Sequence, residues 1–349
     1  MAKEHGAAVG NQDADRKMLE QSNLNETIIK KIVQENYGLK IEKVKHINRG
    51  SANIYNLDNK YILKEFPSDR KIEQITKEYN VIKYLTEKNF RVPTYEETKD
   101  NNYYIEYKNR IIILQKYLDG YVMENNTGDY KKTLESATLL GKLEKTLKDY
   151  KIEEEYKDWP TREKLEKGIE KIKNLILNIK DDNPYKEKII SDLKKRIEIS
   201  ESLLDFDFEE LKKVTIMVCH GDYSVQQFIY NDEKETAIID FETIRNMPID
   251  WEIIRSYSYV DKECKNGKFN LKTFKNYVKE VEKYIDLTEY DLKYMPYIYI
   301  LQLAPSTFGY KEYNNDNTKK SLLDFAFFRS NLCEYLYENI KEIQKELLD

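Results

Sequence analysis

Two aspartates, each at the edge of a short apolar run, are the residues whose types and spacing best suit chemistry. Asp222 follows the run 214–218, which is rich in β-branched residues, and Asp240 directly follows the run 237–239. A polar stretch between the two runs predicts a loop, a strand, a tight turn and a second strand that ends in an acid. This layout would bring the two carboxylates close together, which is unfavourable unless a cation or a proton lies between them.

A divalent metal that carries phosphates would satisfy both acids, with one as its ligand and the other facing a phosphate acceptor. Acids at strand ends are also common as turn residues, so each aspartate taken alone is open to that interpretation. His220, which precedes Asp222 in the sequence His-Gly-Asp, is one of three histidines in the chain. Its position beside Asp222 favours the catalytic interpretation.

The composition describes a globular protein with room for two lobes. The chain has 349 residues, of which 40% are hydrophobic and 35% charged, and its 63 acids and 58 bases give a net charge of −5. No segment is strongly basic, which disfavours nucleic acid as a partner. The mild excess of acids is compatible with a cationic small substrate.

Cysteine usage and hydropathy indicate the cellular compartment. Cys219, Cys264 and Cys333 are odd in number and widely spaced, which favours neither a disulfide framework nor a zinc site. No stretch is apolar enough to span a membrane or to act as a signal peptide. A cytoplasmic protein with no membrane partner is therefore expected. Residues 1–22 are expected to be a disordered leader or an extension added by cloning.

Residues 23–117 are predicted to form a small, β-rich N-terminal lobe. Gly50 and Ser51 lie in a hairpin turn, where small residues let backbone N–H groups approach a phosphate, although most such turns have no such role. Asn25 is expected to cap a short first helix. Strands are predicted over 41–47, 54–57, 60–66, 103–107 and 110–117, with a helix over 70–87.

Lys64 shares a strand face with Ile62 and Phe66 and is therefore expected to point inward, where a lysine needs an anion. Glu78 lies on the apolar stripe of the following helix, between Ile75 and Ile82, and is the obvious partner. The alternatives are a lysine that extends to solvent and a glutamate at the edge of the buried face.

Residues 118–349 are predicted to form a mainly helical C-terminal lobe that holds the catalytic loop and the acceptor site. The backbone of the connector between the lobes, from Gln115 to Tyr117, is placed to bond the edge of a purine. Helices are expected around 139–147, as a pair within 161–204 broken at 181–184, and over 269–284, 289–303 and 320–347.

Together these features resemble the aminoglycoside phosphotransferase and choline kinase-like family, over roughly residue 41 to the C-terminus. His220-Gly221-Asp222, followed by Gln227 after four further residues, is similar to the family's His-Gly-Asp-x-x-x-x-Asn. Residues 238–242 are similar to its Ile-Asp-Trp/Phe-Glu segment. The resemblance implies an α+β, bilobal protein-kinase-like fold with a small β-rich lobe and a larger helical lobe.

The resemblance also implies roles for the residues that match. Lys64, oriented by Glu78, would hold the α- and β-phosphates of ATP or GTP, and Asp240 would bind Mg²⁺. Asp222 would accept or orient the proton of the acceptor hydroxyl, and His220 would brace the catalytic loop.

Two positions depart from the family pattern. Gln227 stands where the family usually has asparagine. Its side chain is longer by one methylene group, so its amide oxygen would reach further toward the metal. The neighbouring Gln226 is a second candidate. Glu252 stands near the place of an aspartate that ties down the catalytic loop, with Asp250 as its competitor.

The leading hypothesis is a Mg²⁺-dependent kinase that phosphorylates a hydroxyl of a small acceptor, aminoglycoside-like or otherwise cationic, as in antibiotic resistance. Asp261, Glu263 and Glu334 are candidates for binding cationic groups. The alternative is a kinase-fold binding or structural protein with weak or no catalysis, such as a spore-coat-type relative. Gln227 favours the alternative, whereas the intact Lys64, Asp222 and Asp240 favour the kinase.

Overall fold

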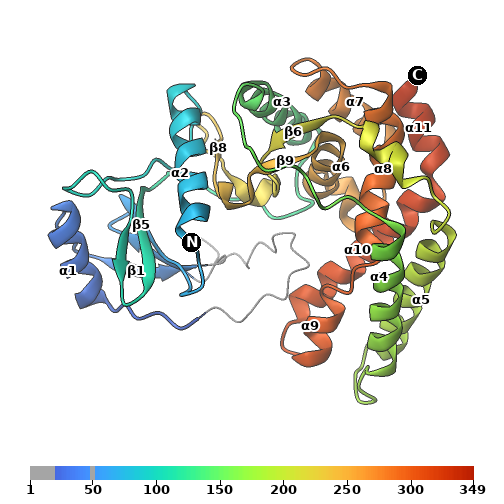
Figure 1. Ribbon diagram of the computed structural model, residues 1–349, viewed down its shortest axis with the longest axis horizontal. Helices are drawn as coiled ribbons and strands as arrows, with labels where there is room; N and C mark the ends of the chain where they lie inside the picture. Colours follow the sequence, from blue (N-terminus) through green and yellow to red (C-terminus); the bar gives the residue numbers. More distant parts are fainter. Residues whose placement is uncertain (1–19, 48–51) are drawn as a thin grey trace. The chain divides into compact units, whose positions relative to one another are not determined.

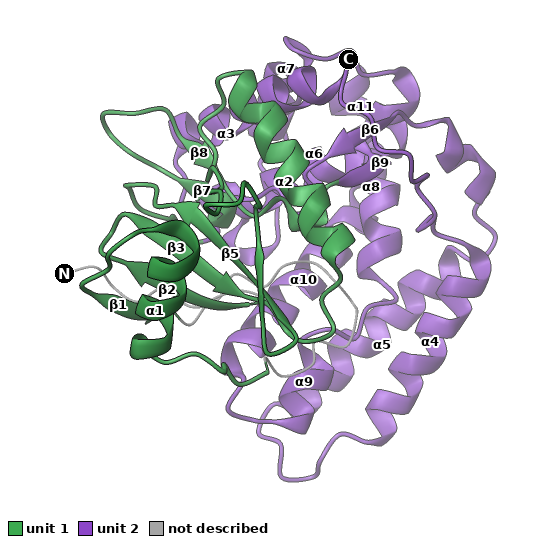
Figure 2. Ribbon diagram, turned by 60° about the vertical axis from the view of Figure 1, so that its left-hand side comes forward, with its two compact units in different colours: residues 1–124, 226–244 green, residues 125–225, 245–349 purple. Residues whose placement is uncertain are grey.

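The computed structural model describes residues 20–47 and 52–349. Two compact units make up the chain: unit 1 comprises Met1–Glu124 and Gln226–Ile244, and unit 2 comprises Asn125–Val225 and Arg245–Asp349 (Figure 2). The chain thus passes from unit 1 to unit 2 after residue 124 and returns briefly to unit 1. The assignment of nucleotide binding to residues 23–117 and of acceptor binding to 118–349 stays a prediction. Gly50, Ser51 and most of the predicted leader lie outside the described residues.

Unit 1 is built on a five-stranded antiparallel sheet with the strand order β1-β2-β3-β5-β4. Two strands of this sheet, β1 and β5, are labelled in Figure 1. The register pairs Lys64 of the third strand with Ile54 on one side and Ile113 on the other. Four of these strands lie within the ranges predicted from alternation and are shorter, whereas β2 begins one residue earlier than predicted. The strands are β1 (Val44–Ile47), β2 (Asn53–Leu57), β3 (Tyr61–Glu65), β4 (Ile105–Tyr107) and β5 (Arg110–Lys116).

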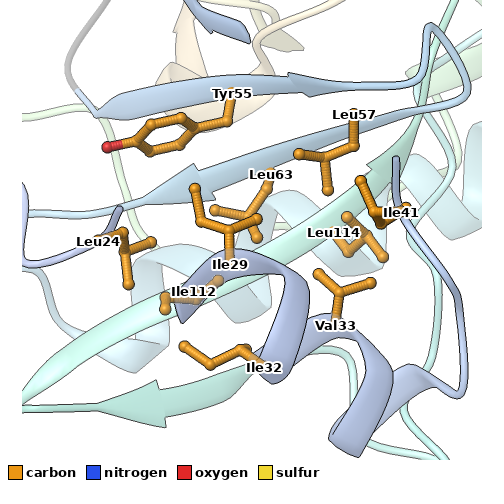
Figure 3. Close-up of a cluster of buried hydrophobic side chains, with 10 residues drawn as sticks. All are labelled: Leu24, Ile29, Ile32, Val33, Ile41, Tyr55, Leu57, Leu63, Ile112 and Leu114. Carbon is orange, nitrogen blue, oxygen red and sulfur yellow. The ribbon is translucent and has the colours of Figure 1, made fainter. Parts of the chain in front are cut away.

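One face of this sheet is covered by α1 (Glu26–Tyr37). The predicted cap is confirmed, because Asn25 accepts a hydrogen bond from the Ile28 N–H at 2.9 Å. Ile29, Ile32 and Val33 of the helix point toward apolar side chains of the strands (Figure 3). Burial of each such side chain stabilises the fold by about 1.5–3 kcal/mol, which fixes this face of the sheet as core.

The opposite face packs against α2 (Ile72–Glu87). Ile75 of this helix is buried with Phe66 and Ile113. Because side chains alternate along a strand, Ile113 and its register partner Lys64 point to this face and not to the α1 face. The sheet therefore directs Lys64 toward the helix that carries Glu78, as the sequence predicts.

The segment that returns to unit 1 forms a short hairpin of β7 (Phe228–Ile229) and β8 (Ala237–Ile238), followed by the 3₁₀ turn η3 (Phe241–Thr243). The N–H groups of Tyr121 and Tyr230 each donate to the other's carbonyl at 2.9 Å, which joins the hairpin to the chain after β5.

Unit 2 is mainly helical and contains one two-stranded sheet, β6 (Ile216–Cys219) with β9 (Arg245–Pro248). The predicted pair of charged helices is confirmed as α4 (Arg162–Leu177) and α5 (Lys186–Ser202). The other helices of eight or more residues are α3 (Tyr130–Leu147), α6 (Ile249–Val260), α7 (Leu271–Glu282), α8 (Glu289–Leu303), α10 (Lys320–Glu338) and α11 (Ile340–Leu348).

Two features of unit 2 differ from the sequence expectation. The single helix predicted over 320–347 is divided at Asn339 into α10 and α11. The helix α6 was not predicted, because all its residues from Ile249 to Val260 are buried and its sequence therefore lacks an amphipathic period. Among the described residues, the structure has no helix of the length and apolarity that crossing a membrane requires.

Candidate active site

In unit 1, Lys64 and Glu78 form a buried ion pair, with Nζ of the lysine 3.9 Å from Oε1 of the glutamate. The side chain of Glu78 is 1% exposed, and that of Lys64 is 14% exposed. Tyr95 donates a hydrogen bond to the other oxygen of Glu78 at 3.1 Å. Burial raises the pKa of Tyr95 well above its usual value, with a further contribution from Glu78, so this hydroxyl stays a donor.

The charge on Lys64 is maintained by more than one carboxylate. Burial alone would lower the pKa of Lys64, but Glu78, Asp240 and Glu242 outweigh burial and raise it above its usual value. Glu242 also pairs with Arg70 at 3.0 Å, which connects η3 to the start of α2. Two cations and three carboxylates of unit 1 therefore lie in one cluster, and two of these carboxylates follow β8.

Asp240 has a backbone conformation that residues other than glycine seldom adopt. Its φ of 69° and ψ of 55° are left-handed, and aspartate is among the residues that best tolerate this region. Such conformations cost free energy and concentrate at functional sites. The N–H of Ile239 donates to the carbonyl of Gln227 at 2.9 Å, which holds the two predicted metal-binding segments side by side.

The donor set at this position fits a hard divalent cation. Asp240 offers carboxylate oxygens and Gln227 an amide oxygen, and Mg²⁺ prefers oxygen ligands of this kind. Gln227 is 3% exposed, whereas Gln226 is only half-buried, so Gln227 is the amide that points inward. Asp240 and Gln227 would hold a magnesium ion here.

The structure shows which groups of the connector are available for the predicted contact with a purine. The N–H of Lys116 donates to Thr94 and that of Tyr117 donates to Lys60, so neither donor is available for a base. Gln115 pairs with Ile62 in register and so lies on the same sheet face as Lys64. Its side chain is 1% exposed, and no described residue accepts a hydrogen bond from its Nε2.

In unit 2, Glu252 of α6 holds the loop that contains Asp222. Its Oε2 accepts from the N–H of His220 at 3.0 Å, and its Oε1 accepts from the N–H of Gly221 at 2.7 Å and of Tyr223 at 3.4 Å. The competitor Asp250 is directed elsewhere, since it accepts from the N–H of Trp251 at 2.8 Å. Glu252 is therefore the residue that ties down this loop.

His220 and Arg255 fix the position of Asp222 within the loop. The Nδ1 of His220, which is fully buried, accepts from the N–H of Asp222 at 3.3 Å, as expected of a bracing histidine. Arg255 pairs with Oδ1 of Asp222 at 2.5 Å and donates to the carbonyl of Tyr223 at 3.2 Å. Burial would lower the pKa of Arg255, but Asp222 together with Tyr259, Tyr299 and Glu252 outweighs burial and raises it. The guanidinium therefore stays charged and orients the carboxylate.

Beneath the same loop lies a buried pair of acids, Glu144 of α3 and Glu252. Ligand atoms of these two glutamates and of Cys219 all lie within 4.8 Å of one another. Two carboxylates at this separation in a buried site cannot both be charged. Burial and the charge of Glu252 raise the pKa of Glu144 well above its usual value. Glu144 is therefore the neutral acid and Glu252, which accepts the backbone N–H groups, is the carboxylate.

Of the three acids predicted to bind a cationic acceptor, two have partners within unit 2 and the third lies at the surface. Asp261 is 3% exposed and accepts from the hydroxyl of Tyr257 at 2.7 Å. Glu334 lies 3.6 Å from Lys195, and Glu263 is exposed.

Sequence reasoning missed Arg255 and Glu144. Arg255 follows Glu252 by three residues, so helical spacing would have placed both on one face of α6 had that helix been recognised. Glu144 gave no comparable signal, because its helix is far from the motif in sequence.

A β-rich unit with a lysine–glutamate pair, and a helical unit with a His-Gly-Asp loop, define the class of kinase-like phosphotransferases. The profile of the phosphotransferase enzyme family matches residues 43–266 of this chain. The chain belongs to that family. A comparison with curated protein sequences gave no match.

Solved structures share the fold at low sequence identity. A spectinomycin phosphotransferase in complex with ADP and spectinomycin is 15% identical, with a TM-score of 0.66 over 92% of this chain and 100% of its own. An amicoumacin kinase in complex with AMP-PNP and Ca²⁺ is 14% identical, with a TM-score of 0.62 over 89% of this chain and 94% of its own. The choline kinase of Streptococcus pneumoniae is 16% identical, with a TM-score of 0.53 over 92% and 98%. The protein-kinase-like fold expected from the motifs is thereby confirmed.

Proposed function

We propose that this protein is a Mg²⁺-dependent kinase that transfers the γ-phosphate of ATP or GTP to a hydroxyl of a small molecule. The observation that carries the proposal is the buried cluster of unit 1, in which Lys64 is held by Glu78 and lies in the field of Asp240. An ammonium group beside a metal-binding carboxylate is the arrangement that phosphoryl transfer requires for binding and charge neutralisation.

Each residue of unit 1 has a distinct task in this proposal. Lys64 binds the α- and β-phosphates, and Glu78 holds its ammonium group in place. Asp240 and Gln227 hold Mg²⁺, which neutralises charge on the phosphates when it is bound. Gln115 donates its buried Nε2–H to the base.

Unit 2 supplies the group that receives the proton. The acceptor hydroxyl oxygen forms a bond to the γ-phosphorus, the bond from that phosphorus to the bridging oxygen breaks, and the nucleoside diphosphate leaves. The hydroxyl proton passes to Asp222. Glu252 and His220 hold the loop so that this carboxylate keeps its position, and Arg255 sets its orientation.

The comparisons support the reaction class more strongly than the acceptor. Structures with this fold contain ADP or AMP-PNP, which supports a nucleotide as the donor. Their acceptors include spectinomycin, and a choline kinase shares the fold. An antibiotic such as an aminoglycoside is therefore one acceptor class to test, with choline-like compounds as another.

One residue favours a second candidate function, a binding or structural protein with weak catalysis. Gln227 replaces the usual asparagine of the motif, and its longer side chain changes the reach of the metal ligand. Protein that binds Mg²⁺ and nucleotide but transfers no phosphate to any acceptor would fit this second function.

The deciding experiment has two parts. Melting temperature is measured with and without millimolar Mg²⁺ and AMP-PNP or GMP-PNP, and a kinase should be stabilised by at least one of them. Release of nucleoside diphosphate is then screened across aminoglycosides, other antibiotics, choline and hydroxy acids, with ATP and GTP in turn. No stabilisation by either nucleotide would contradict the proposed function.

A further inference from the structure

Arg329 of α10 is a buried cation without an acceptor on one edge of its guanidinium. It is 1% exposed, and no residue in the described part of the chain accepts a hydrogen bond from its Nε or its Nη2. The guanidinium lies over the rings of Phe325 and Phe308, at 5.7 and 5.9 Å from their centroids. Aromatic rings attract a cation, but they do not accept the hydrogen bonds that its N–H groups need.

Two other buried arginines of unit 2 have strong acceptors, although Nη2 of Arg196 and Nε of Arg255 also lack one. Arg196 donates to Ser330 at 2.8 Å and to the carbonyls of Leu303 and Ser306 at 2.7 and 2.8 Å. Arg255 is paired with Asp222. Buried charges are generally paired and hydrogen-bonded in this way, and Arg329 departs from the rule.

A second buried cation, Arg196, lies near Arg329. Burial lowers the pKa of Arg196, and the charge of nearby Arg329 is a further cause of the shift. Asp192 is the carboxylate that acts on Arg196, and it is already shared between Lys188 and the hydroxyl of Tyr310. Two guanidinium groups thus lie near each other in the interior of unit 2, where an anion between them would be stabilised.

Aromatic rings connect Arg329 to the residue that orients Asp222. The guanidinium of Arg255 lies 4.8 Å from the ring centroid of Tyr259. That ring is 5.9 Å from the ring of Phe325, over which Arg329 also lies. Phe325 and Phe328 are only half-buried, so this group of rings extends to the surface of unit 2.

We infer that Arg329 binds a carboxylate of the acceptor whose hydroxyl is phosphorylated at Asp222, so that the substrate is a hydroxy acid. Nε–H and one N–H of Nη2 project in parallel from the same edge of a guanidinium and match the two oxygens of a carboxylate. The inference rests on the proposed function and reverses the expectation of a cationic acceptor, whose candidate acids Asp261 and Glu334 have partners of their own.

The first test measures binding without turnover. Phenylacetate and the neutral phenylacetamide have the same ring and differ in the anionic group, so melting temperature is measured with each at matched concentrations. Phenylacetate alone should stabilise the wild-type protein.

The Arg329→Met variant should lose the stabilisation by phenylacetate, with apparent affinity weaker by about tenfold or more. Arg162→Met, which removes an exposed arginine of α4, should keep it. Equal shifts with the amide, or a retained shift in Arg329→Met, would overturn the inference.

The second test separates a ligand-binding arginine from a structural one. Arg329→Met removes a charge that lacks hydrogen-bond acceptors, so its urea midpoint without ligand should equal or exceed that of the wild type. Arg196→Met should have a lower midpoint, because its carbonyl partners lose their donors. If both variants are destabilised equally, Arg329 is structural and the inference fails. If Arg329→Met does not fold, the wild-type comparison of phenylacetate with phenylacetamide still decides.

The acceptor screen distinguishes this inference from the proposed function. Acceptors that are turned over should carry a carboxylate, and conversion of that group to an amide should raise KM more than it lowers kcat. Turnover of only neutral or cationic acceptors would overturn the inference and leave the kinase assignment intact. If Arg329 binds a carboxylate but no nucleotide stabilises the protein, the kinase assignment is contradicted. The anion-binding site at Arg329 would then stand without it.

Discussion

Arg255 holds Oδ1 of Asp222 at 2.5 Å, and the same guanidinium donates to the carbonyl of the next residue, Tyr223, at 3.2 Å. Both groups are buried, so the pair is shielded from solvent. A carboxylate fixed through one oxygen presents the other in a defined direction. This relationship would hold Asp222 in place for its proposed role as proton acceptor, and it gives a direct test of that role.

Asp222→Asn should lower kcat by about a hundredfold or more, because a general base contributes roughly 10²–10⁴ to the rate. Nucleotide binding should be retained, since the side chains proposed to bind the phosphates lie in unit 1. The measurements are steady-state kinetics and the melting-temperature shift with Mg²⁺ and AMP-PNP. Full activity of the variant would refute the assignment of the base.

Arg255→Met should destabilise the fold by about 3–5 kcal/mol, because it leaves the carboxylate of Asp222 buried without its cation. The free energy of unfolding in urea measures this loss. Arg245→Met is the matched control, since half-buried Arg245 pairs with the exposed Asp158 and the loss of this pair should cost about 0–1 kcal/mol. Equal losses in both variants would show that burial of the Arg255 pair has no energetic consequence.

Lys64→Met should abolish most of the stabilisation by Mg²⁺ and AMP-PNP, because it removes the ammonium group proposed to bind the phosphates. The exposed Lys83 of α2 provides the control, and Lys83→Met should respond to nucleotide like the wild type. Thermal melting over a range of nucleotide concentrations gives both affinities. A Lys64→Met variant with wild-type affinity would remove the main support for nucleotide binding in unit 1.

Local patterns predicted the parts of the fold that depend on local chemistry. Periodicity or side-chain hydrogen bonding predicted the cap at Asn25, the inward direction of Lys64 and the position of Glu78 on the apolar face of α2. The structure confirms the geometry of all three. The break at Asn339 and the buried helix α6 were not foreseen, because tertiary packing decides them. Glu144 gave no signal either, since Glu252 and Cys219 are distant from it in sequence. Arg329 gave none because its lack of hydrogen-bond acceptors is visible only in the folded protein.

The stability of the protein should fall as pH rises because of Glu144. Its pKa is raised in the folded state, so between the unfolded value of 4.5 and the folded value the native state binds one proton more than the unfolded state. The contribution of this group is therefore fully present below 4.5 and is lost as pH rises through the folded pKa. One such proton changes the free energy of unfolding by about 1.4 kcal/mol per pH unit.

Glu144→Gln isolates this effect, because the amide keeps a donor toward Glu252 and cannot ionise. Its free energy of unfolding, measured in urea from pH 5 to pH 8, should rise relative to the wild type as pH increases. The exposed Glu263 serves as the control, and Glu263→Gln should run parallel to the wild type. Parallel curves for Glu144→Gln as well would mean that Glu144 is ionised in the folded protein.

The metal requirement tests Asp240 and Gln227 together. Asp240→Asn should keep the fold, because asparagine also tolerates the left-handed backbone at φ 69°. It should nevertheless lose Mg²⁺-dependent transfer, because the charged ligand is gone.

Gln227→Asn restores the amide usual in the family and should lower the Mg²⁺ concentration that gives half-maximal activity. Activity is measured against Mg²⁺ after treatment with EDTA. If the Gln227→Asn variant has the same Mg²⁺ dependence as the wild type, the amide at 227 does not reach the metal, and Asp240 must bind it with other ligands.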